Sequence, residues 1–308
     1  MPSPLQDLMA SGRRHAPPEL AALMRRRPWR VLLDAARCWG LIVGAFVALA
    51  AHPTWWVALL AFVVIGTQQY ALSVLAHDGR HRNLFAQRTV NDLFSVVLLQ
   101  APVGVDFHRH QELHLKHHRV LGAENDPDLR LYAASDKAER RSFLLYLSGL
   151  TTLPMIADDD DAAATRSSRW VAVPAQLLVA AGICAVLPWW CWLTHWVAPL
   201  YLLMFVPHRM RQFCEHAQPV VPDRLATEER LVTYRPPWPE RVLLAPFHIG
   251  YHAEHHLWPA VPYFNLPRLA RALPSPPLFE VRGSYLGFLW RYFRGLPLIP
   301  AWSGAGAP

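Results

Sequence analysis

Charged residues are scarce in this chain. Of its 308 residues, 17% are Asp, Glu, Lys or Arg and 53% are apolar, whereas a soluble domain is usually more charged and less apolar. Residues 170–207 contain no Asp, Glu, Lys or Arg at all. Uncharged apolar runs of this length are typical of membrane spans rather than of a soluble core. The sequence therefore predicts an integral membrane protein.

Signatures of several other protein classes are also missing. The four cysteines form no Cys-x-x-Cys pair, which argues against a disulfide framework or a thiolate zinc site. No basic surface rich in aromatic residues accompanies the formal net charge of +7, so no nucleic-acid partner is expected. No apolar segment with a small-residue cleavage site directly follows the first arginines, so we interpret residues 1–30 as a cytoplasmic N-terminal segment.

Four apolar segments have the composition of membrane spans. They cover residues 31–51, 55–76, 170–188 and 193–210, close to the length of about 20 residues that crosses a bilayer. Five arginines precede Pro28, whereas the turns at 52–54 and 189–192 contain no Lys or Arg. The positive-inside bias then places both termini, and the long segment between the second and third spans, in the cytoplasm. In a bacterium the membrane would be the inner, cytoplasmic one.

The predicted fold class is an all-α integral membrane protein, with four transmembrane helices and a cytoplasmic helical cap. Residues 31–260 are expected to form the four-span domain, and the proline-rich residues 261–308 a cytoplasmic C-terminal tail. Two further apolar runs, at 93–105 and 143–156, are too short to span. We expect both to lie in the membrane interface or under the cap.

The histidines of this chain are concentrated in two regions. Thirteen of its 16 histidines fall within residues 77–118 and 208–256, which contain one His-x-x-x-His and two His-x-x-His-His motifs. Residues three or four apart share a face of a helix, so each motif can direct its imidazoles to a common point. The histidines of the three motifs are His77 and His81, then His114, His117 and His118, then His252, His255 and His256.

A metal site is the simplest explanation of these motifs. The predicted spans place all three on the same side of the membrane, although no histidine was used to assign the spans. Clustered imidazoles repel one another when protonated, whereas neutral imidazoles bind iron, zinc, copper or nickel. The Glu-x-x-His of carboxylate di-iron bundles and the His-Glu-x-x-His of zinc proteases are both absent. Eight histidines exceed the ligands of one tetrahedral zinc, which favours two metals, with iron as the redox-active choice.

As a set, the motifs resemble those of the membrane fatty acid desaturase family, a histidine-rich di-iron group that also includes acyl hydroxylases, acetylenases and carotenoid ketolases. The resemblance covers residues 55–273 and rests on HDGRH at 77–81, HLKHH at 114–118, NDPD at 125–128, CEH at 214–216 and GYHAEHHLWPAVPYFNLPRL at 250–269. It implies two non-haem iron ions and O2 as a co-substrate, and it adds His216 to the ligands. The implied ligands are His77, His81, His114, His117, His118, His216, His252, His255 and His256.

Four acidic residues near the implied ligands can accept hydrogen bonds from the ring nitrogens that do not face the metal. They are Asp78, Asp126, Asp128 and Glu254. The chain departs from the family pattern at Arg80, Arg82 and Gln111, which leaves the acyl headgroup or carrier open. Four further histidines match no ligand position, namely His108, His110, His208 and His248.

The activity that the resemblance implies is an oxygen-dependent acyl desaturation, which removes hydrogen from two adjacent carbons. The sequence contains no four-cysteine redox cluster and no evident haem domain. Electrons are therefore expected from a separate ferredoxin- or cytochrome b5-like donor, and the substrate from a membrane lipid or an acyl carrier. The same iron site could instead serve acyl hydroxylation, acetylenation or carotenoid ketolation. A non-catalytic membrane protein that binds a metal or haem is a further alternative.

Overall fold

The computed structural model of the chain describes residue 10 and residues 12–121, 123, 125–128, 140–150, 168–216, 232–274 and 279–294. Its contacts divide the chain into two compact units. Unit 1 comprises residues 1–25, 115–163 and 209–308, and unit 2 comprises residues 26–114 and 164–208. Helices α6 (Phe107–Val120) and α12 (Val206–His216) contribute residues to both units.

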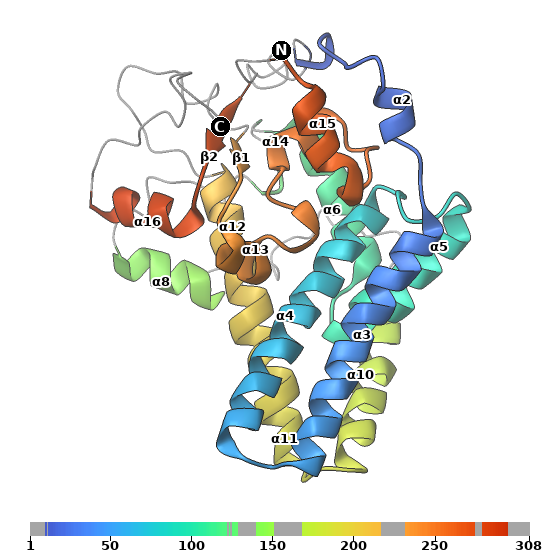
Figure 1. Cartoon of the computed structure of the whole chain (residues 1–308), viewed down its shortest axis with the longest axis vertical. Coiled ribbons are helices and arrows are strands. Elements are labelled where there is room, and N and C mark those ends of the chain that lie inside the picture. Colours follow the sequence, from blue (N-terminus) through green and yellow to red (C-terminus); the bar gives the residue numbers. More distant parts are fainter. Residues whose placement is uncertain are drawn as a thin grey trace. The chain divides into compact units, whose positions relative to one another are not determined.

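Unit 2 is built from long apolar helices (Figure 1). Helix α3 begins at Pro28, because the first helical position does not need the N–H that proline lacks. Helix α3 packs along α4, and α4 in turn packs against the π-helical segments η4 and η5. The elements of unit 2 are α3 (Pro28–Ala51), α4 (Trp55–Arg80), α5 (Arg88–Phe94), η1 (Ser95–Gln100), η2 (Ala101–Val103), α10 (Arg169–Cys184), α11 (Trp190–Trp192), η4 (Leu193–Val197) and η5 (Leu200–Phe205).

Two helices of unit 2 are long and apolar enough to cross a membrane. These are α3 and α4, each with a mean hydropathy of 1.7, and they match the first two predicted spans in position and composition. Over the third predicted span lies α10, a shorter apolar helix, and over the fourth lies a run of α- and π-helical segments. Residues 88–103 and α6, bent by 105° at their junction, qualify together as one more candidate. The described residues thus contain two candidate spans, or three with the bent pair, where the sequence predicted four.

Side-chain amides and close helix contacts hold unit 2 together. Gln69 of α4 donates a hydrogen bond of 3.1 Å to the carbonyl oxygen of Trp196 in η4, where the π-helical turn alters the backbone hydrogen bonding. Gln176 of α10 donates to the carbonyl oxygen of Pro102 at 2.5 Å. A Cβ at Gly66 would lie 2.6 Å from Cβ of Leu203, so only glycine allows α4 to approach η5 this closely. Satisfied backbone groups of this kind are a requirement inside a membrane.

Unit 1 consists of short helices and one small parallel sheet. Strand β1 (Val232–Tyr234) pairs with β2 (Glu280–Arg282), and Thr233 lies opposite Val281. The chain is mostly helical, as predicted, but the all-α prediction missed this sheet, because three residues are too few to leave an alternating pattern. The helices of unit 1 are α2 (Leu20–Leu23), α8 (Arg140–Ser148), α13 (Trp238–Leu244), η6 (Pro246–His248), α14 (His252–Leu257), η7 (Tyr263–Asn265), α15 (Leu266–Ala272) and α16 (Tyr285–Phe293).

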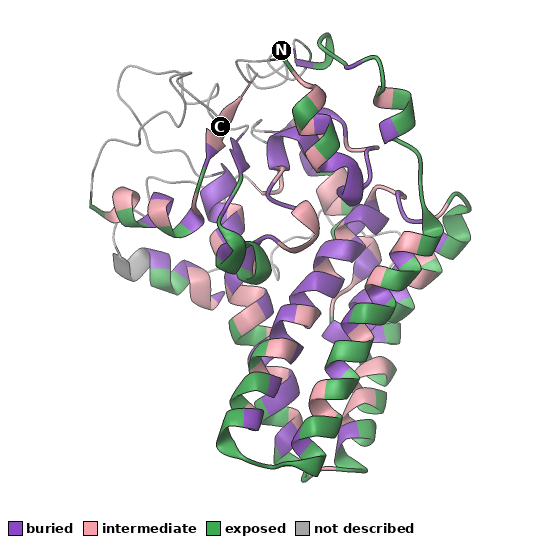
Figure 2. Cartoon of the chain, viewed as in Figure 1, coloured by how far each residue is buried: buried purple, intermediate pink, exposed green. Residues whose placement is uncertain are grey.

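An apolar core in unit 1 supports α14, the helix that carries the third histidine motif. Ala253 and Leu257 of α14 pack in this core together with Leu23 of α2. Arg13 Nε donates to the carbonyl oxygen of Leu257 at 3.0 Å, and Asn265 Nδ2 donates to that of Leu23 at 2.6 Å. Figure 2 shows α14 as buried along its length. Segments from near both ends of the chain therefore hold this helix.

Parts of three predicted segments lie outside the described residues. In the predicted N-terminal segment these are residues 1–9 and 11, and in the predicted tail residues 275–278 and 295–308. The short apolar run at 93–105 is mainly helical, within α5, η1 and η2. The run at 143–156 is helical in α8 as far as Ser148, and its residues 151–156 are outside the described part.

Candidate metal centre

Unit 2 brings three of the predicted ligands together. His77 lies in the last turn of α4, His81 follows the end of that helix, and His114 lies on α6. The ring centroid of His114 is 4.4 Å from that of His77 and 4.8 Å from that of His81. The Nε2 atoms of His81 and His114 are 2.8 Å apart. The ligand atoms of all three lie within 4.8 Å of one another, a separation that suits nitrogens bound about 2 Å from a shared ion.

The end of α4 is pinned by short contacts. Asn91 donates from Nδ2 to the carbonyl oxygen of Gly79 at 2.8 Å, and a side chain at Gly79 would collide with Ser95. Gln111 of α6 donates a hydrogen bond to the carbonyl oxygen of Arg80 at 2.9 Å. Gln111, a residue that departs from the family pattern, therefore connects α6 to α4. These contacts set the backbone on which His77 and His81 stand.

Unit 1 brings together the other six predicted ligands, on three elements. His117 and His118 lie near the end of α6, His216 ends α12, and His252, His255 and His256 lie on α14. The ligand atoms of His117, His216 and His256 lie within 4.8 Å of one another, and all three residues are buried. The other three lie beside this group: ring centroids are 4.1 Å apart for His118 and His256, 4.5 Å for His252 and His216, and 4.9 Å for His255 and His118.

The imidazoles of unit 1 have the surroundings expected of metal ligands. Nε2 of His252 and both ring nitrogens of His256 are buried, and among the described residues they have no hydrogen-bond partner. A buried polar atom without a partner costs about 1–3 kcal/mol, a cost that a bound metal ion removes. Burial, reinforced by neighbouring charges, lowers the pKa of His252 and of His256. Neutral imidazole is the form that ligates, so these residues fit a metal ion.

Two carboxylates engage ligands of unit 1 through Nδ1. Asp126 Oδ1 lies 2.8 Å from Nδ1 of His117, and Glu215 Oε2 lies 3.2 Å from Nδ1 of His252. An Nδ1–H that donates to a carboxylate makes Nε2 the ligating nitrogen. Burial lowers the pKa of His117, but the hydrogen bond to Asp126 and the charges of Asp128 and Asp126 outweigh it, so the net shift is upward.

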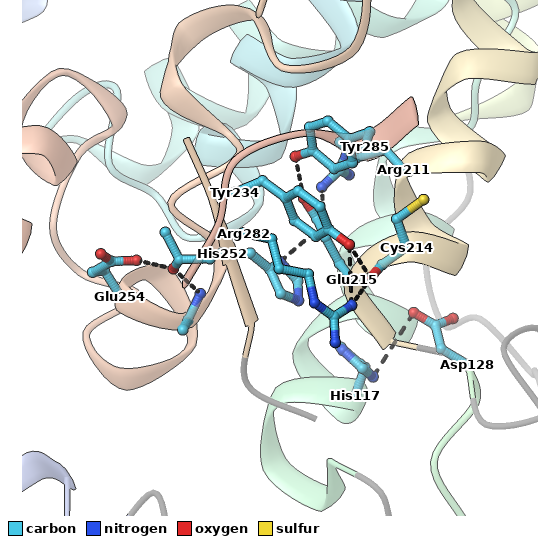
Figure 3. Close-up of polar contacts among 12 residues, drawn as sticks. His117, Asp128, Arg211, Cys214, Glu215, Tyr234, His252, Glu254, Arg282 and Tyr285 are labelled. Atoms are coloured by element: carbon cyan, nitrogen blue, oxygen red, sulfur yellow. Dashed lines mark hydrogen bonds and ion pairs between the residues drawn. The ribbon is translucent and has the colours of Figure 1, made fainter. Parts of the chain in front are cut away.

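The other three predicted acids behave differently. Asp128 Oδ2 is 3.8 Å from Nδ1 of His117 (Figure 3), farther than the 2.8 Å of Asp126 Oδ1. Asp78 is buried, and its backbone oxygen accepts a hydrogen bond from the N–H of His81. Glu254 accepts from the hydroxyl of Thr233, which in turn accepts from the N–H of Ala253 at 3.3 Å. Glu254 thus ties α14 to strand β1, and burial raises its pKa to about 7.

Sequence reasoning did not single out Glu215, although the residue belongs to the CEH motif. The structure surrounds its carboxylate with the guanidinium of Arg211, the hydroxyl of Tyr285 and the ring of His252. Burial raises the pKa of Glu215 to about 7, against the lowering effects of Arg211 and Tyr285. The spacing of Arg211 and Glu215, four residues apart on α12, was a signal that the sequence did offer.

The four histidines that match no family position stay outside both groups of potential ligands found among the described residues. The ring of His208 lies edge-on to that of Tyr70, with centroids 6.4 Å apart. His110 Nδ1 lies 2.9 Å from the backbone oxygen of Asp106. His108 lies on α6, and His248 ends η6 with a φ of 62°. These positions give none of the four a direct role in the metal groups.

Comparison with known proteins identifies the family of the chain. The family model described as "Fatty acid desaturase" matches residues 53–282. The chain is 27% identical to a dihydrorhizobitoxine desaturase of Bradyrhizobium elkanii, over 84% of this chain and 80% of that protein. It is 23% identical to an sn-1 acyl-lipid omega-3 desaturase (ferredoxin) of Nostoc sp. (76% and 72%) and 26% identical to a beta-carotene ketolase of Paracoccus sp. (74% and 88%). Since the matched region contains all three histidine motifs, this chain belongs to the fatty acid desaturase family.

Proposed function

We propose that the protein is an oxygen-dependent di-iron desaturase that introduces a double bond into a fatty acyl chain. The observation that carries the proposal is the pair of histidine groups in a chain of the desaturase family. One iron would be held by His77, His81 and His114, and the other by His117, His216 and His256, and His118, His252 and His255 complete the predicted ligands. Together with O2 and external electrons, the iron pair would supply the oxidising power that removes hydrogen from two adjacent carbons.

The residues of the chain would hold, orient and shield this centre. Burial keeps His252 and His256 neutral, which is the state that a metal requires. Asp126 Oδ1 is hydrogen-bonded to Nδ1 of His117, and Glu215 Oε2 lies 3.2 Å from Nδ1 of His252, so both carboxylates would direct Nε2 of these rings towards a bound ion. The buried surroundings of the unit 1 ligands exclude water, which protects an oxidising centre from side reactions.

We also propose that the chain crosses the membrane four times, with both termini in the cytoplasm. The helical residues 170–184 and 190–210 would supply the third and fourth spans. Support comes from the lack of Asp, Glu, Lys and Arg in residues 170–207 and from the arginine-rich flank before α3. In a bacterium this arrangement would place the protein in the inner membrane, with its substrate drawn from the lipid or from an acyl carrier.

Electrons for the reaction would come from a separate protein. A ferredoxin-like donor is favoured by the similarity to the sn-1 acyl-lipid omega-3 desaturase (ferredoxin) of Nostoc sp.. A cytochrome b5-like donor is the alternative. Turnover of the purified enzyme with O2 and a simple hydride donor alone would contradict a separate carrier.

Acyl profiling tests the proposed reaction. Host cells with defined lipids are analysed by mass spectrometry with and without the gene, and a product lighter by two hydrogens is expected. The His118→Ala and His255→Ala variants serve as controls and should give no product. Purified protein should contain about two irons per chain and show no haem absorbance. Zinc alone, in protein expressed with ample iron, would contradict the proposal and favour a non-catalytic metal-binding protein.

Carotenoid ketolation is a second candidate, since the beta-carotene ketolase of Paracoccus sp. is matched over 88% of its length. The stretch FHIGYHAEHHLWP at 247–259 also resembles ketolases of the same family. A host that accumulates β-carotene distinguishes the two reactions. A pigment that gains oxygen while the fatty acids stay unchanged would favour ketolation. Acyl hydroxylation would appear in the same analysis as a fatty acid heavier by one oxygen.

A further inference from the structure

Tyr285 is the first residue of α16, in the segment that the sequence predicted to be a tail, and its side chain is completely buried. Its hydroxyl donates a hydrogen bond of 2.8 Å to Oε1 of Glu215. Its ring stacks on that of Tyr234, with centroids 4.0 Å apart and planes inclined by 11°. The hydrogen bond at the tip of the phenol and the stacking on its face involve different parts of the side chain, so a substitution can remove the hydroxyl and keep the ring.

Glu215 connects this phenol to a predicted metal ligand. Tyr285 donates a hydrogen bond to Oε1 of Glu215. Oε2 of Glu215 forms an ion pair with Arg211 and lies 3.2 Å from Nδ1 of His252 (Figure 3). Contacts to both oxygens set the plane of the carboxylate. The orientation of the carboxylate in turn sets the direction in which Nδ1 of His252 points, and hence the direction of Nε2 on the opposite side of the ring.

The position of Tyr285 is itself fixed by its neighbours. Glu240 accepts from the backbone N–H of Tyr285 at 2.8 Å and from the hydroxyl of Ser284 at 2.7 Å. Strand β2, which ends at Arg282, pairs with β1. Nη1 of Arg282 lies 3.1 Å from the hydroxyl oxygen of Tyr234. The same hydroxyl donates to the backbone oxygen of Cys214 at 3.0 Å. Residues 280–285 are thus fastened to the end of α12 that carries His216.

We propose that Tyr285 is a positioning residue of the metal centre, which acts through Glu215 to hold Nε2 of His252 towards the metal. The inference rests on the proposed function, because it assigns His252 to a metal. It makes residues 280–293 a structural part of the site. Outer partners of metal ligands change metal affinity or activity by about 10–100-fold when removed. Tyr285 lies one contact further out, so an effect of about tenfold or less is expected.

The test compares Tyr285→Phe with Tyr292→Phe in the full-length protein. Each substitution removes one hydroxyl from α16, and Tyr285→Phe keeps the ring that stacks on Tyr234. Tyr292 is a matched control, because its ring packs on Phe213 with centroids 5.2 Å apart. Measurements are the iron content per chain, the rate of iron loss to a chelator, the Mössbauer spectrum, and kcat and KM separately.

Tyr285→Phe should release iron about threefold to tenfold faster than wild type, alter the Mössbauer signal of one iron, and lower kcat with little change in KM. Tyr292→Phe should match wild type in each measurement. The melting temperature of the metal-free protein should be similar in the two variants. Equal iron release by the two variants would overturn the inference, as would a loss of metal-free stability in Tyr285→Phe that accounts for the whole effect.

A double-variant cycle tests the route through Glu215. If Tyr285 acts through this carboxylate, Tyr285→Phe should add nothing to the iron loss of Glu215→Gln, whereas independent effects would add. Additive effects would overturn the inference while leaving the proposed function intact. A wild-type protein that binds no iron would instead overturn the proposed function, and this inference with it.

Discussion

The two histidine groups are built on different kinds of support. In unit 2, His77 and His81 stand at the end of a 26-residue helix, α4, so the helix itself sets their spacing. In unit 1, three predicted ligands stand on α14, which has only six residues. A helix of that length has no stability of its own in water. Its position must therefore come from residues elsewhere in the chain.

The contacts around α14 show what this support consists of. Arg13 binds the carbonyl oxygen of Leu257 at the C-terminal end of α14, where a positive charge is favourable. Glu254 binds Thr233 of β1, and Glu215 lies against His252. The comparison teaches that a long helix presents ligands through local geometry, whereas a short one depends on hydrogen bonds and charges from distant segments.

Removing one ligand from each group gives the largest expected effects. His114→Ala in unit 2 and His256→Ala in unit 1 should each abolish product formation and leave about one iron per chain, as measured by metal analysis. His52→Ala, in the exposed turn after α3, is the control and should keep both the iron and the activity. Loss of both irons from either variant would contradict the assignment of one ion to each group.

Removal of the Asp126 carboxylate in unit 1 should strongly lower the affinity for iron. Asp126→Ala takes away the hydrogen bond to Nδ1 of His117 and should lower iron affinity by about 10–100-fold. Asp126→Asn should lose less, because the amide oxygen can still accept from Nδ1–H. Asp128→Ala should have the smallest effect of the three, since its carboxylate is 3.8 Å from the ring. Chelator competition measures the iron affinity of each variant. Equal losses of affinity in Asp126→Ala and Asp128→Ala would contradict the proposed role of Asp126.

Gly250 lies two residues before α14 and is closely packed, so its substitution tests the packing at the start of this helix. A Cβ at Gly250 would lie 2.8 Å from the backbone oxygen of Tyr234, and Tyr234 N–H also donates to the Gly250 oxygen at 2.8 Å. Because neither strand β1 nor this turn can move without disturbing that bond, Gly250→Ala should destabilise the protein by about 1–3 kcal/mol. Thermal unfolding in detergent measures the change, and iron loss should accompany it. An unchanged melting temperature would contradict the tight packing around β1.

The smallest effect is expected in the long helices of unit 2. Gly40 lies within α3, and a Cβ there would meet nothing within 4 Å. Gly40→Ala should therefore stabilise the protein, by up to about 1 kcal/mol, because alanine loses less backbone freedom in a helix. The same thermal measurement serves as the matched control for Gly250→Ala. A destabilisation at Gly40 would show that α3 has a close neighbour that the present contacts do not include.

Much of the candidate site was predictable because its signals are local. The i, i+3 and i, i+4 spacings in the three motifs predicted imidazoles on common helix faces. The structure brings His77 and His81 together, but it divides the second motif, with His114 in one group of potential ligands and His117 in the other. His216 had no such spacing and was identified only through the family resemblance. Among the predicted acids, Asp126 lies nine positions from His117 and contacts it, whereas Glu254 contacts Thr233 instead of a ligand.

The features that were missed depend on contacts between residues far apart in the chain. Tyr285 and Glu215 are 70 positions apart, and no periodic pattern connects them. The parallel strands β1 and β2 are three residues each, too short to alternate visibly. Helices α10, η4 and η5 were expected as simple spans, but the π-helical turns could not be foreseen from hydropathy.

The sequence by itself determined the two long apolar helices and most of the histidines that gather, because hydropathy and helical spacing act over a few neighbouring residues. Only the tertiary structure decided which nitrogen of His252 and His117 would face a metal. That choice depends on carboxylates brought from other segments and on the residues that hold them, such as Tyr285 for Glu215. Hydrogen-bond direction and burial arise only when those segments pack together, so they leave no mark on the local pattern.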